Sequence, residues 1–389
     1  MFNSMALDTK PAAKTTIRAV VAASLFCMLS DAFRSEVNAQ ARGLPRYDRM
    51  VLLETSSETS ANVELGDLNG DGNLDVVLAK GRHWPLVNRV LLGNGKGGFS
   101  KPYDLDSISN KSYSSRLFDL DSDGDLDVVV SNDRPDINLV YLNDGDGRFK
   151  LSSKFGQSKW PTRNATVADL NNDGFFDVVL ANRGGPNVIC VNDGRGNFDT
   201  KYITFSKYSA TTITSADFNN DGLTDLAVPH RDGGQSYVYV QTRGASFDFT
   251  KVPFGPEDAS IRMAQAADID SDGNMDIVAI DTKKGAVIYF QVSEGVFSSE
   301  KHLGQSSTPY ALAVSDLDND GHHDIIVGFQ NARSVIYFND GSGKSFTSQS
   351  FGDGKGSVYG FAVGDIDKDG RLDIAAARSG APNVIYMAD

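Results

Sequence analysis

Short apolar runs alternate with polar, glycine-rich loops along almost the whole chain. The run 311–314 leads into an Asp-rich loop, and the β-branched run 325–327 leads out of it. A further apolar segment, 334–338, follows, and turns such as Asn143-Asp144-Gly145 suit tight hairpins because these residue types tolerate positive φ. No helical periodicity separates the runs. The pattern therefore predicts an all-β chain of short antiparallel strands.

One nine-residue pattern, Asp-x-Asp/Asn-x-Asp-Gly-x-x-Asp, occurs seven times. The copies span 67–75, 119–127, 169–177, 217–225, 268–276, 316–324 and 365–373. Successive copies begin 52, 50, 48, 51, 48 and 49 residues apart. Such a constant spacing is the signature of stacked supersecondary units, none of which can bury its apolar face alone.

Each unit has room for four strands, so the repeat predicts a seven-bladed β-propeller of four-stranded antiparallel blades. We expect blades at about 58–105, 112–155, 160–205, 209–254, 259–303, 307–352 and 357–389 plus 45–54. The last unit ends after its third strand, whereas residues 47–53 form a spare strand ahead of the first loop. The N-terminal strand is therefore expected to complete the last blade, closing the ring and removing its sheet edges.

The N-terminal segment has the layout of a secretory signal peptide. Lys10, Lys14 and Arg18 precede an 11-residue apolar run, 19–29, and a polar stretch ends in Ala39-Gln40-Ala41. The run is too short to span a membrane. We expect residues 1–41 to be removed and 42–389 to form one domain that is secreted, periplasmic or at the cell surface, with no integral membrane segment. A buried or disordered N-terminal helix is the alternative.

Cys190 would be the only cysteine left after such cleavage, so no intramolecular disulfide is expected. The apolar run around it, 188–191, favours a buried, inert thiol. Something other than a disulfide bond must therefore stabilise the fold.

The Asp-rich loops have the chemistry of calcium sites. Ca²⁺ takes six to eight oxygen ligands, and side chains at positions 1, 3, 5 and 9 with a backbone carbonyl at position 7 can surround one ion. Glycine at position 6 allows the sharp turn that this requires. We expect up to seven ions, one per blade. The alternative is seven solvated turns, in which crowded carboxylates would repel one another.

The expected ligands follow the five positions of the loop. They are Asp67, Asp119, Asp169, Asp217, Asp268, Asp316 and Asp365 at position 1, and Asn69, Asp121, Asn171, Asn219, Asp270, Asp318 and Asp367 at position 3. Position 5 holds Asp71, Asp123, Asp173, Asp221, Asp272, Asp320 and Asp369, and position 9 holds Asp75, Asp127, Asp177, Asp225, Asp276, Asp324 and Asp373. The backbone carbonyls at position 7 belong to Asn73, Asp125, Phe175, Leu223, Asn274, His322 and Arg371.

These loops resemble the calcium-binding FG-GAP, or VCBS-type, repeats of integrin α-subunit propellers and of many secreted bacterial proteins. The resemblance covers essentially all of the expected mature chain. Phe155-Gly156, Phe254-Gly255 and Phe351-Gly352 match the Phe-Gly part of the repeat, and Leu303-Gly304 replaces it in one unit. The resemblance implies a β-propeller that carries calcium in its loops.

The net charge argues against a nucleic-acid partner when the chain is taken whole. The 389 residues include 37 Lys+Arg and 51 Asp+Glu, for a formal charge of −14. In the expected mature chain, however, 25 acids occupy ligand positions, and 33 basic residues face 23 acids elsewhere. The negative net charge therefore comes mostly from the expected metal ligands, and the remaining surface is basic enough to bind an anion.

The propeller end opposite the loops is the expected ligand-binding face. If each inner strand runs into its Asp-rich loop, the segments that join second and third strands lie at this other end. The candidate ligand-binding residues are Arg116, Arg163, Arg183, Arg262, Trp84, Trp160, His83, His230, Tyr310 and Tyr359. Rings stack on sugar faces and Arg pairs with carboxylate or sulfate, so the set suits an acidic sugar chain. The alternative is that these loops are simply polar.

Two functions are consistent with these residues. The first is a non-catalytic binding or adhesion module, monomeric, for an extracellular glycan, including an anionic one, or for a protein. No Gly-x-Ser-x-Gly, His-Glu-x-x-His or phosphate-binding loop is present, and we assign no catalytic residue. The second is an enzyme that cleaves an acidic polysaccharide by β-elimination. His83, His230, Tyr310 or Tyr359 would then be the base, and Arg163 or Arg262 would neutralise the carboxylate.

Overall fold

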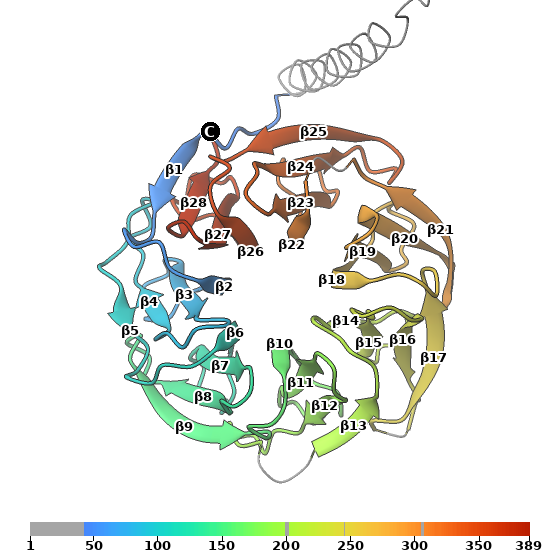
Figure 1. The fold of residues 1–389 in the computed structure, drawn as a ribbon, viewed down its shortest axis with the longest axis horizontal. Coiled ribbons are helices and arrows are strands. Elements are labelled where there is room, and N and C mark those ends of the chain that lie inside the picture. Colours follow the sequence, from blue (N-terminus) through green and yellow to red (C-terminus); the bar gives the residue numbers. More distant parts are fainter. Residues whose placement is uncertain (1–42, 199–201, 245, 305–306) are drawn as a thin grey trace, which may run out of the picture.

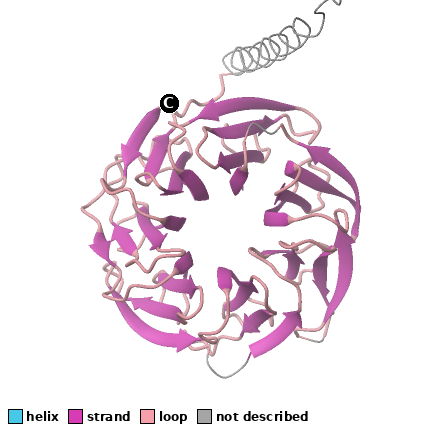
Figure 2. Ribbon diagram, in the orientation of Figure 1, coloured by secondary structure: helices cyan, strands magenta, loops and turns pink. Residues whose placement is uncertain are grey.

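The computed structural model describes residues 43–198, 202–244, 246–304 and 307–389. Seven four-stranded antiparallel sheets form a closed ring around a central axis (Figure 1). The described part of the chain consists of strands joined by loops (Figure 2), and it contains no helix that could cross a membrane. The chain is therefore an all-β seven-bladed propeller, as the repeat predicts. The expected signal peptide, residues 1–41, lies outside the described residues.

The strands of the first four blades follow one another from the channel outward. They are β2 (Ser60–Gly66), β3 (Asp75–Lys80), β4 (Arg89–Leu91) and β5 (Tyr103–Asp104); β6 (Ser112–Phe118), β7 (Asp127–Asn132), β8 (Asn138–Asn143) and β9 (Phe149–Phe155); β10 (Thr162–Ala168), β11 (Asp177–Asn182), β12 (Asn187–Cys190) and β13 (Tyr202–Ser206); and β14 (Thr214–Ala216), β15 (Asp225–Val228), β16 (Ser236–Gln241) and β17 (Phe249–Phe254).

The remaining three blades repeat this order, except that the last one takes its outer strand from the other end of the chain. They are β18 (Ile261–Ala267), β19 (Asp276–Asp281), β20 (Gly285–Ser293) and β21 (Val296–His302); β22 (Pro309–Ser315), β23 (Asp324–Phe329), β24 (Ser334–Asn339) and β25 (Phe346–Phe351); and β26 (Ser357–Gly364), β27 (Asp373–Ser379), β28 (Val384–Met387) and β1 (Arg49–Leu52).

The second strand of each blade lies deepest in the protein. β7 and β23 are buried at every residue, because neighbouring blades cover both faces of each sheet. The outermost strands have one face in solvent, so β9 alternates between half-buried and exposed residues before ending at buried Phe155. The hydrophobic core is thus divided among the interfaces between blades.

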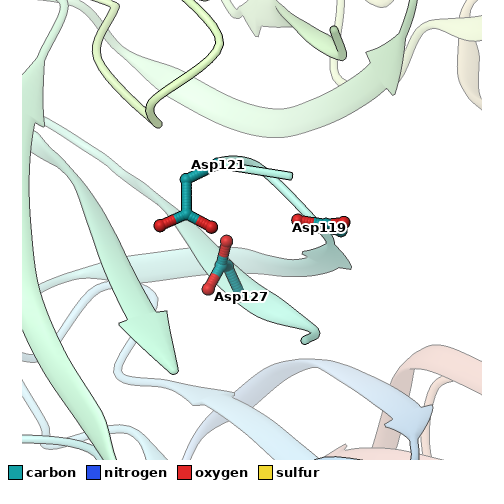
Figure 3. Close-up of side chains that lie close together, drawn as sticks. All are labelled: Asp119, Asp121 and Asp127. Carbon is teal, nitrogen blue, oxygen red and sulfur yellow. The ribbon is translucent and has the colours of Figure 1, made fainter. Parts of the chain in front are cut away.

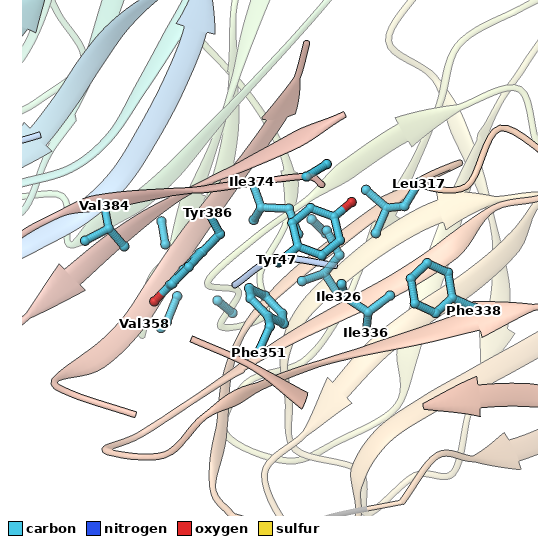
Figure 4. Packing of buried hydrophobic residues seen from close by; sticks show 14 of the residues in the cluster. Tyr47, Leu317, Ile326, Ile336, Phe338, Phe351, Val358, Ile374, Val384 and Tyr386 are labelled. Carbon is cyan, nitrogen blue, oxygen red and sulfur yellow. The ribbon is translucent and has the colours of Figure 1, made fainter. Parts of the chain in front are cut away.

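Tyr47 anchors the N-terminal segment in one of these interfaces. It is 2% exposed and packs among residues of the sixth and seventh blades, including Phe351 and Ile374 (Figure 4). Its hydroxyl donates a 2.9 Å hydrogen bond to the carbonyl of Leu372. The segment ahead of β1 is therefore part of the core.

The N-terminal strand closes the ring, as the repeat count predicts. β1 pairs antiparallel with β28, in a register that places Arg49 opposite Met387. Just beyond β1, Glu54 accepts a 2.8 Å hydrogen bond from Asn383 of the last blade and also pairs with Lys80 of the first blade. Lys80 is fully buried. The two ends of the chain are therefore joined by a strand pairing and by a buried charged contact.

Cys190 lies in β12 and is fully buried. Burial raises the pKa of its thiol above the ordinary range. The thiol is therefore unreactive, as its apolar neighbours predict.

Candidate functional site

The first aspartate holds each Asp-rich loop in a fixed shape. In the second blade, Asp119 accepts hydrogen bonds from the backbone N–H groups of Asp123 (3.2 Å) and Gly124 (3.1 Å). The chain turns through two residues of positive φ, Ser122 (65°) and Gly124 (98°). Glycine occupies the second turn in all seven loops, where an L side chain would be strained. The first turn, at position 4, is not indicated by the sequence pattern, because it holds Asn, Ser or Lys in six loops.

The last aspartate of each loop ties it to the rest of the blade. Asp127 is fully buried, and its two oxygens accept 2.9 Å hydrogen bonds from the backbone N–H groups of Leu120 and Asn143. The same pair of bonds recurs in the other six blades. Burial, together with nearby carboxylates, raises the pKa of Asp127 to about 7 and that of Asp324 to about 8. These buried carboxyl groups thus need a positive charge nearby to stay ionised at neutral pH.

Carboxylates gather at four of the seven loops. In the second blade, ligand oxygens of Asp119, Asp121 and Asp127 lie within 4.8 Å of one another, and Asp121 and Asp127 point toward each other (Figure 3). Clusters at the same loop positions occur in the fifth and seventh blades, and in the sixth blade Asp316, Asp318 and Asp320 cluster at positions 1, 3 and 5. One oxygen of Asp121 is buried with no hydrogen-bond partner among the described residues, as is one oxygen of Asp270 and of Asp367. An unpartnered buried carboxylate oxygen is costly unless a cation contacts it, so these acidic clusters fit a metal ion.

The other three loops replace the third-position carboxylate by an amide. Asn69 donates a hydrogen bond to Asp71 (3.3 Å), and Asn171 donates one to Asp173 (2.8 Å). The amide therefore supplies one hydrogen bond to the neighbouring carboxylate within the loop. The residue at position 3 is thus Asn in three loops and Asp in four, and the four loops with Asp are those in which carboxylates cluster.

A pocket of about 70 Å³ lies at the opposite end of the channel from these loops. Each blade contributes a lining residue six positions before the first aspartate of its loop. We call these seven residues the mouth ring: Ala61, Tyr113, Arg163, Thr211, Arg262, Tyr310 and Tyr359. Since every inner strand runs from the mouth ring to an Asp-rich loop, the two sites occupy opposite ends of the propeller.

A β-bulge places the mouth-ring residue in six of the seven blades. The register between β6 and β7 shifts from Ser112 to Ser114, so Tyr113 has no partner on β7. The same shift occurs at Arg163, at Arg262 and at the equivalent residues of the first, sixth and seventh blades. A bulge bends the strand and redirects one side chain. The repeated bulge thus explains why one position per blade reaches the pocket.

Cationic side chains of the pocket lie against aromatic rings. The guanidinium of Arg163 lies 4.3 Å from the ring centre of Tyr113, and that of Arg262 lies 3.9 Å from the ring centre of Tyr310. The rings of Tyr310 and Tyr359 meet edge to face at 5.1 Å. These stacked pairs hold the guanidinium planes in place.

Arg82 enters the pocket from the loop after β3. The mouth-ring residue of this first blade is Ala61, whose small side chain leaves the mouth open at this point. The Arg82 guanidinium lies 3.5 Å from the ring centre of Tyr359 in the blade on one side and 5.6 Å from that of Tyr113 on the other. Arg82 is 9% exposed and has a positive φ of 46°. The first blade therefore contributes a cation from a loop rather than from its bulge.

The three guanidiniums differ in their charge partners. Arg163 pairs with Asp133 at 2.7 Å. Arg82 and Arg262 form no ion pair with any described residue, and Arg262 donates only to the backbone carbonyl of Tyr310, at 3.3 Å. Burial, and then the charge of Arg82, lowers the pKa of Arg262 to about 10. One buried and one partly buried positive charge thus remain without a carboxylate among the described residues.

Four of the ten residues selected from the sequence line the pocket: Arg163, Arg262, Tyr310 and Tyr359. His83 and Trp84 lie beside it, in the same loop as Arg82. The Nδ1 atom of His83 is 3.2 Å from the hydroxyl of Tyr113, and Trp84 is 70% exposed.

The other four selected residues lie elsewhere. Arg116 pairs with Glu64 and donates a hydrogen bond to Asn164 but does not itself line the pocket, and Arg183 pairs with Asp232 on the surface. Trp160 is 9% exposed and packs against the ring of Tyr202, whereas His230 is 2% exposed and lies beneath the ring of Tyr208. We therefore leave these four residues out of the candidate site.

Tyr113 and Arg82 are the aromatic and cationic pocket residues that the sequence-based selection left out. Tyr113 could have been found by aligning the seven repeats on their loops, because it occupies the same position as Arg163 and Arg262. Arg82 lies in a segment that joins second and third strands, so its place at this propeller end follows from the sequence, but its entry into the pocket beside the small Ala61 does not.

The geometry defines a class of protein: a closed seven-bladed propeller with Asp-rich turns at one end of its channel. A family model for the FG-GAP-like repeat matches residues 67–130, 119–180, 169–228, 217–279, 268–327 and 316–376. The chain belongs to this family, as the resemblance of its loops indicates. No curated protein sequence matches the chain significantly.

Solved structures share the fold at low sequence identity. Two crystal structures of BBS1N in complex with ARL6DN, soaked with mercury and with lead, each have a TM-score of 0.61, at 13% and 14% identity, and cover 88% of this chain and 96% of the other. A lectin from Agrocybe aegerita, described as recognising non-reducing terminal N-acetylglucosamine, has a TM-score of 0.55 at 20% identity, covering 75% of this chain and 80% of the lectin. These similarities show the fold alone.

Proposed function

We propose that this protein is a secreted, calcium-stabilised β-propeller that acts as a non-catalytic binding module for an extracellular glycan. The pocket at the mouth ring carries the proposal, because it is where the seven blades differ in chemistry while the fold repeats. A structural role requires the same residue in each blade, as at position 9 of the loops. A site for one asymmetric ligand requires different residues at equivalent positions.

Calcium is the metal that we assign to the acidic clusters. The ligands are carboxylate and carbonyl oxygens, which suit hard cations, and the clusters contain neither His nor Cys. Ca²⁺ tolerates irregular geometry and seven or eight ligands, whereas Mg²⁺ demands a smaller octahedron. Asp119, Asp121, Asp123 and Asp127, with the carbonyl of Asp125, would hold the ion of the second blade.

Two observations support export and a structural role for calcium. The segment 1–41 has the layout of a signal peptide, and export would expose the protein to the high calcium concentrations outside cells. Cys190 is the one cysteine of the described residues and is free, so metal sites take the place that disulfides hold in many exported proteins.

The structural neighbours support a binding role without identifying the ligand. One is described in complex with a protein partner and another as a lectin. Propellers of this shape thus present either kind of ligand surface. We favour a glycan because tyrosine rings, and the exposed ring of Trp84 beside them, suit stacking on sugar faces.

A lyase acting on acidic polysaccharide is the second candidate. The contact between Arg262 and Tyr310 favours it, because β-elimination needs a cation that neutralises the carboxylate and a base beside it. His83, next to Tyr113 and Arg163, is a second base candidate. His230 is not, because it is buried beneath Tyr208.

A glycan array with calcium-loaded protein tests the proposal. We expect selective binding that is weakened in an Arg163→Gln/Arg262→Gln variant and unchanged in Arg183→Gln, which alters a surface pair outside the pocket. The ultraviolet absorbance of unsaturated sugar products, followed with the bound glycans as substrates, separates the candidates. Product formation would establish the lyase, and absence of selective binding across the array would contradict a glycan-binding role.

A further inference from the structure

The proposed glycan-binding role leaves open which part of a ligand the pocket holds. We propose that the mouth-ring pocket binds one oxyanionic group, a carboxylate or a sulfate, carried by a sugar of the glycan, and that Arg82 and Arg262 are its anchors. This inference rests on the proposed function and gives the ligand its chemical class.

The unbalanced charge of the pocket is the first argument. Arg82 is 9% exposed and Arg262 is partly buried, yet neither has a carboxylate partner among the described residues. Arg163 differs, because Asp133 neutralises it at 2.7 Å. A buried cation without a partner is costly, and two close together repel each other. An anion between them would remove both penalties, and a guanidinium fork matches the paired oxygens of a carboxylate or sulfate.

The arrangement of the rings is the second argument. Arg82 stacks on Tyr359 at 3.5 Å and Arg262 stacks on Tyr310 at 3.9 Å, and these two rings touch each other edge to face. Stacking fixes a guanidinium by its face and leaves the N–H groups at its edge available for hydrogen bonds. The two cations are therefore ordered before any ligand arrives, which lowers the entropic cost of binding.

The backbone of the Arg82 loop is arranged to keep this side chain in place. Gly81 has a φ of 112°, and a Cβ atom at this position would lie 2.4 Å from the carbonyl oxygen of Asn110. The next residue, Arg82, also has positive φ, and its N–H donates a 3.1 Å hydrogen bond to the carbonyl of Ser112. Strained backbone of this kind persists where the surrounding structure imposes it, and it is common at binding sites.

The size of the pocket limits what can enter it. Its volume of about 70 Å³ is far below the range of about 300–1,000 Å³ of pockets that enclose a small-molecule ligand. The pocket therefore accepts a single substituent, while the sugar that carries it stays outside. Trp84 is 70% exposed, two residues after Arg82, and offers a ring at the edge of the pocket for that sugar.

The test measures binding of three disaccharides to the full mature protein in calcium. They end in glucuronate, in 6-sulfoglucose and in glucose, and titration calorimetry is combined with tryptophan fluorescence, in which a ligand-induced change is expected from the exposed Trp84 and not from the buried Trp160. We expect a charged disaccharide to bind at least about tenfold more tightly than the neutral one, and its affinity to fall as salt is raised. Which charged disaccharide binds distinguishes carboxylate from sulfate.

Variants separate the pocket from the surrounding surface. Arg82→Gln and Arg262→Gln should each weaken binding of the charged disaccharide by about tenfold or more and leave the melting temperature in calcium nearly unchanged. Arg183→Gln, an exposed residue at the same propeller end that pairs with Asp232, should bind as the wild type does. Arg82→Lys should recover only part of the affinity, because lysine lacks the planar fork.

The outcomes distinguish this inference from the proposed function. Binding of the neutral disaccharide as tightly as the charged ones, or binding unaffected by either pocket variant, would overturn the inference and leave a glycan-binding role intact. Absence of binding to all three disaccharides by a protein that melts cooperatively in calcium would also overturn the inference, whereas only absence of selective binding across the glycan array would overturn the proposed function.

Discussion

The two ends of this propeller use the same repeat in opposite ways. At the loop end, position 9 is aspartate in every blade, and each aspartate accepts the same two backbone hydrogen bonds. At the mouth ring, the equivalent positions hold Ala, Tyr, Arg, Thr, Arg, Tyr and Tyr. Uniform residues meet a requirement that every blade has, whereas varied residues at one position create a single asymmetric site. The comparison separates the residues that hold the fold from those that we assign to binding.

Removing the strand that closes the ring should have the largest effect, because both ends depend on a closed ring. Deletion of residues 43–54 removes β1, the core residue Tyr47 and the Glu54 contact with Lys80. We expect loss of cooperative unfolding in calorimetry. The matched control, Tyr47→Phe, removes one hydrogen bond and should cost only about 1 kcal/mol. A truncated protein that melts cooperatively at the wild-type temperature would contradict this account.

Removing calcium should have the next largest effect and should act through the loop end. An ion at about one hundred times its Kd stabilises the native state by about 2.7 kcal/mol per site, so several sites together should lower the melting temperature by about 10 °C or more on chelation. Calcium added back should restore it, and an equal concentration of magnesium should restore less. A melting temperature that chelator leaves unchanged would remove calcium from the account.

Single substitutions in one loop should distinguish the aspartate that ties the loop to its blade from an aspartate that contributes only charge to the cluster. Asp127→Ala leaves the buried N–H groups of Leu120 and Asn143 unpaired, which costs about 3–5 kcal/mol in chelator, and more in calcium because a ligand of the ion is lost as well. Asp121→Asn removes a charge from the cluster and imitates the loops that carry Asn69 or Asn171. It should lower stability only when calcium is present. Equal losses for both variants in chelator would show that the two positions do not differ in this way.

The smallest effect concerns pH at the mouth end. Burial lowers the pKa of His230 from about 6.5 to about 4, and Lys251 adds to this. Between these values the unfolded chain binds the proton and the folded chain does not, so stability falls as pH drops from about 6.5 toward 4. The melting temperature of His230→Gln should therefore fall less steeply over this range than that of the wild type. If the melting temperatures of the two proteins changed with pH in parallel, His230 would not be responsible for the loss of stability.

Much of this fold can be predicted from one sequence because the number of repeats gives the number of blades. Seven loops at a constant spacing indicate seven blades, and a spare N-terminal strand beside an incomplete last unit indicates how the ring closes. The pocket is harder to predict, because no particular residue type marks the position of a β-bulge. Arg116 and Arg163 both lie on inner strands, yet only Arg163 occupies the bulge.

Burial of aromatic residues is the other part that the sequence does not determine. Trp84 and Trp160 both precede proline, but Trp84 lies between β3 and β4 and is exposed, whereas Trp160 lies just before β10 and packs on Tyr202 in a core between blades. Which tryptophan faces solvent depends on contacts with residues distant in the sequence. Such contacts come from residues about 40 to 50 positions away, beyond the reach of local pattern.

The measurement that tests the separation of the two ends most directly is a paired one on the Arg82→Gln/Arg262→Gln double variant. Its melting temperature in calcium and its binding to the array glycans of the wild type are recorded with the same preparation. We expect a melting temperature within a few degrees of the wild type and loss of glycan binding. Retained binding, or a fall in stability as large as that caused by chelation, would contradict the assignment of the mouth ring to binding and of the loops to the fold.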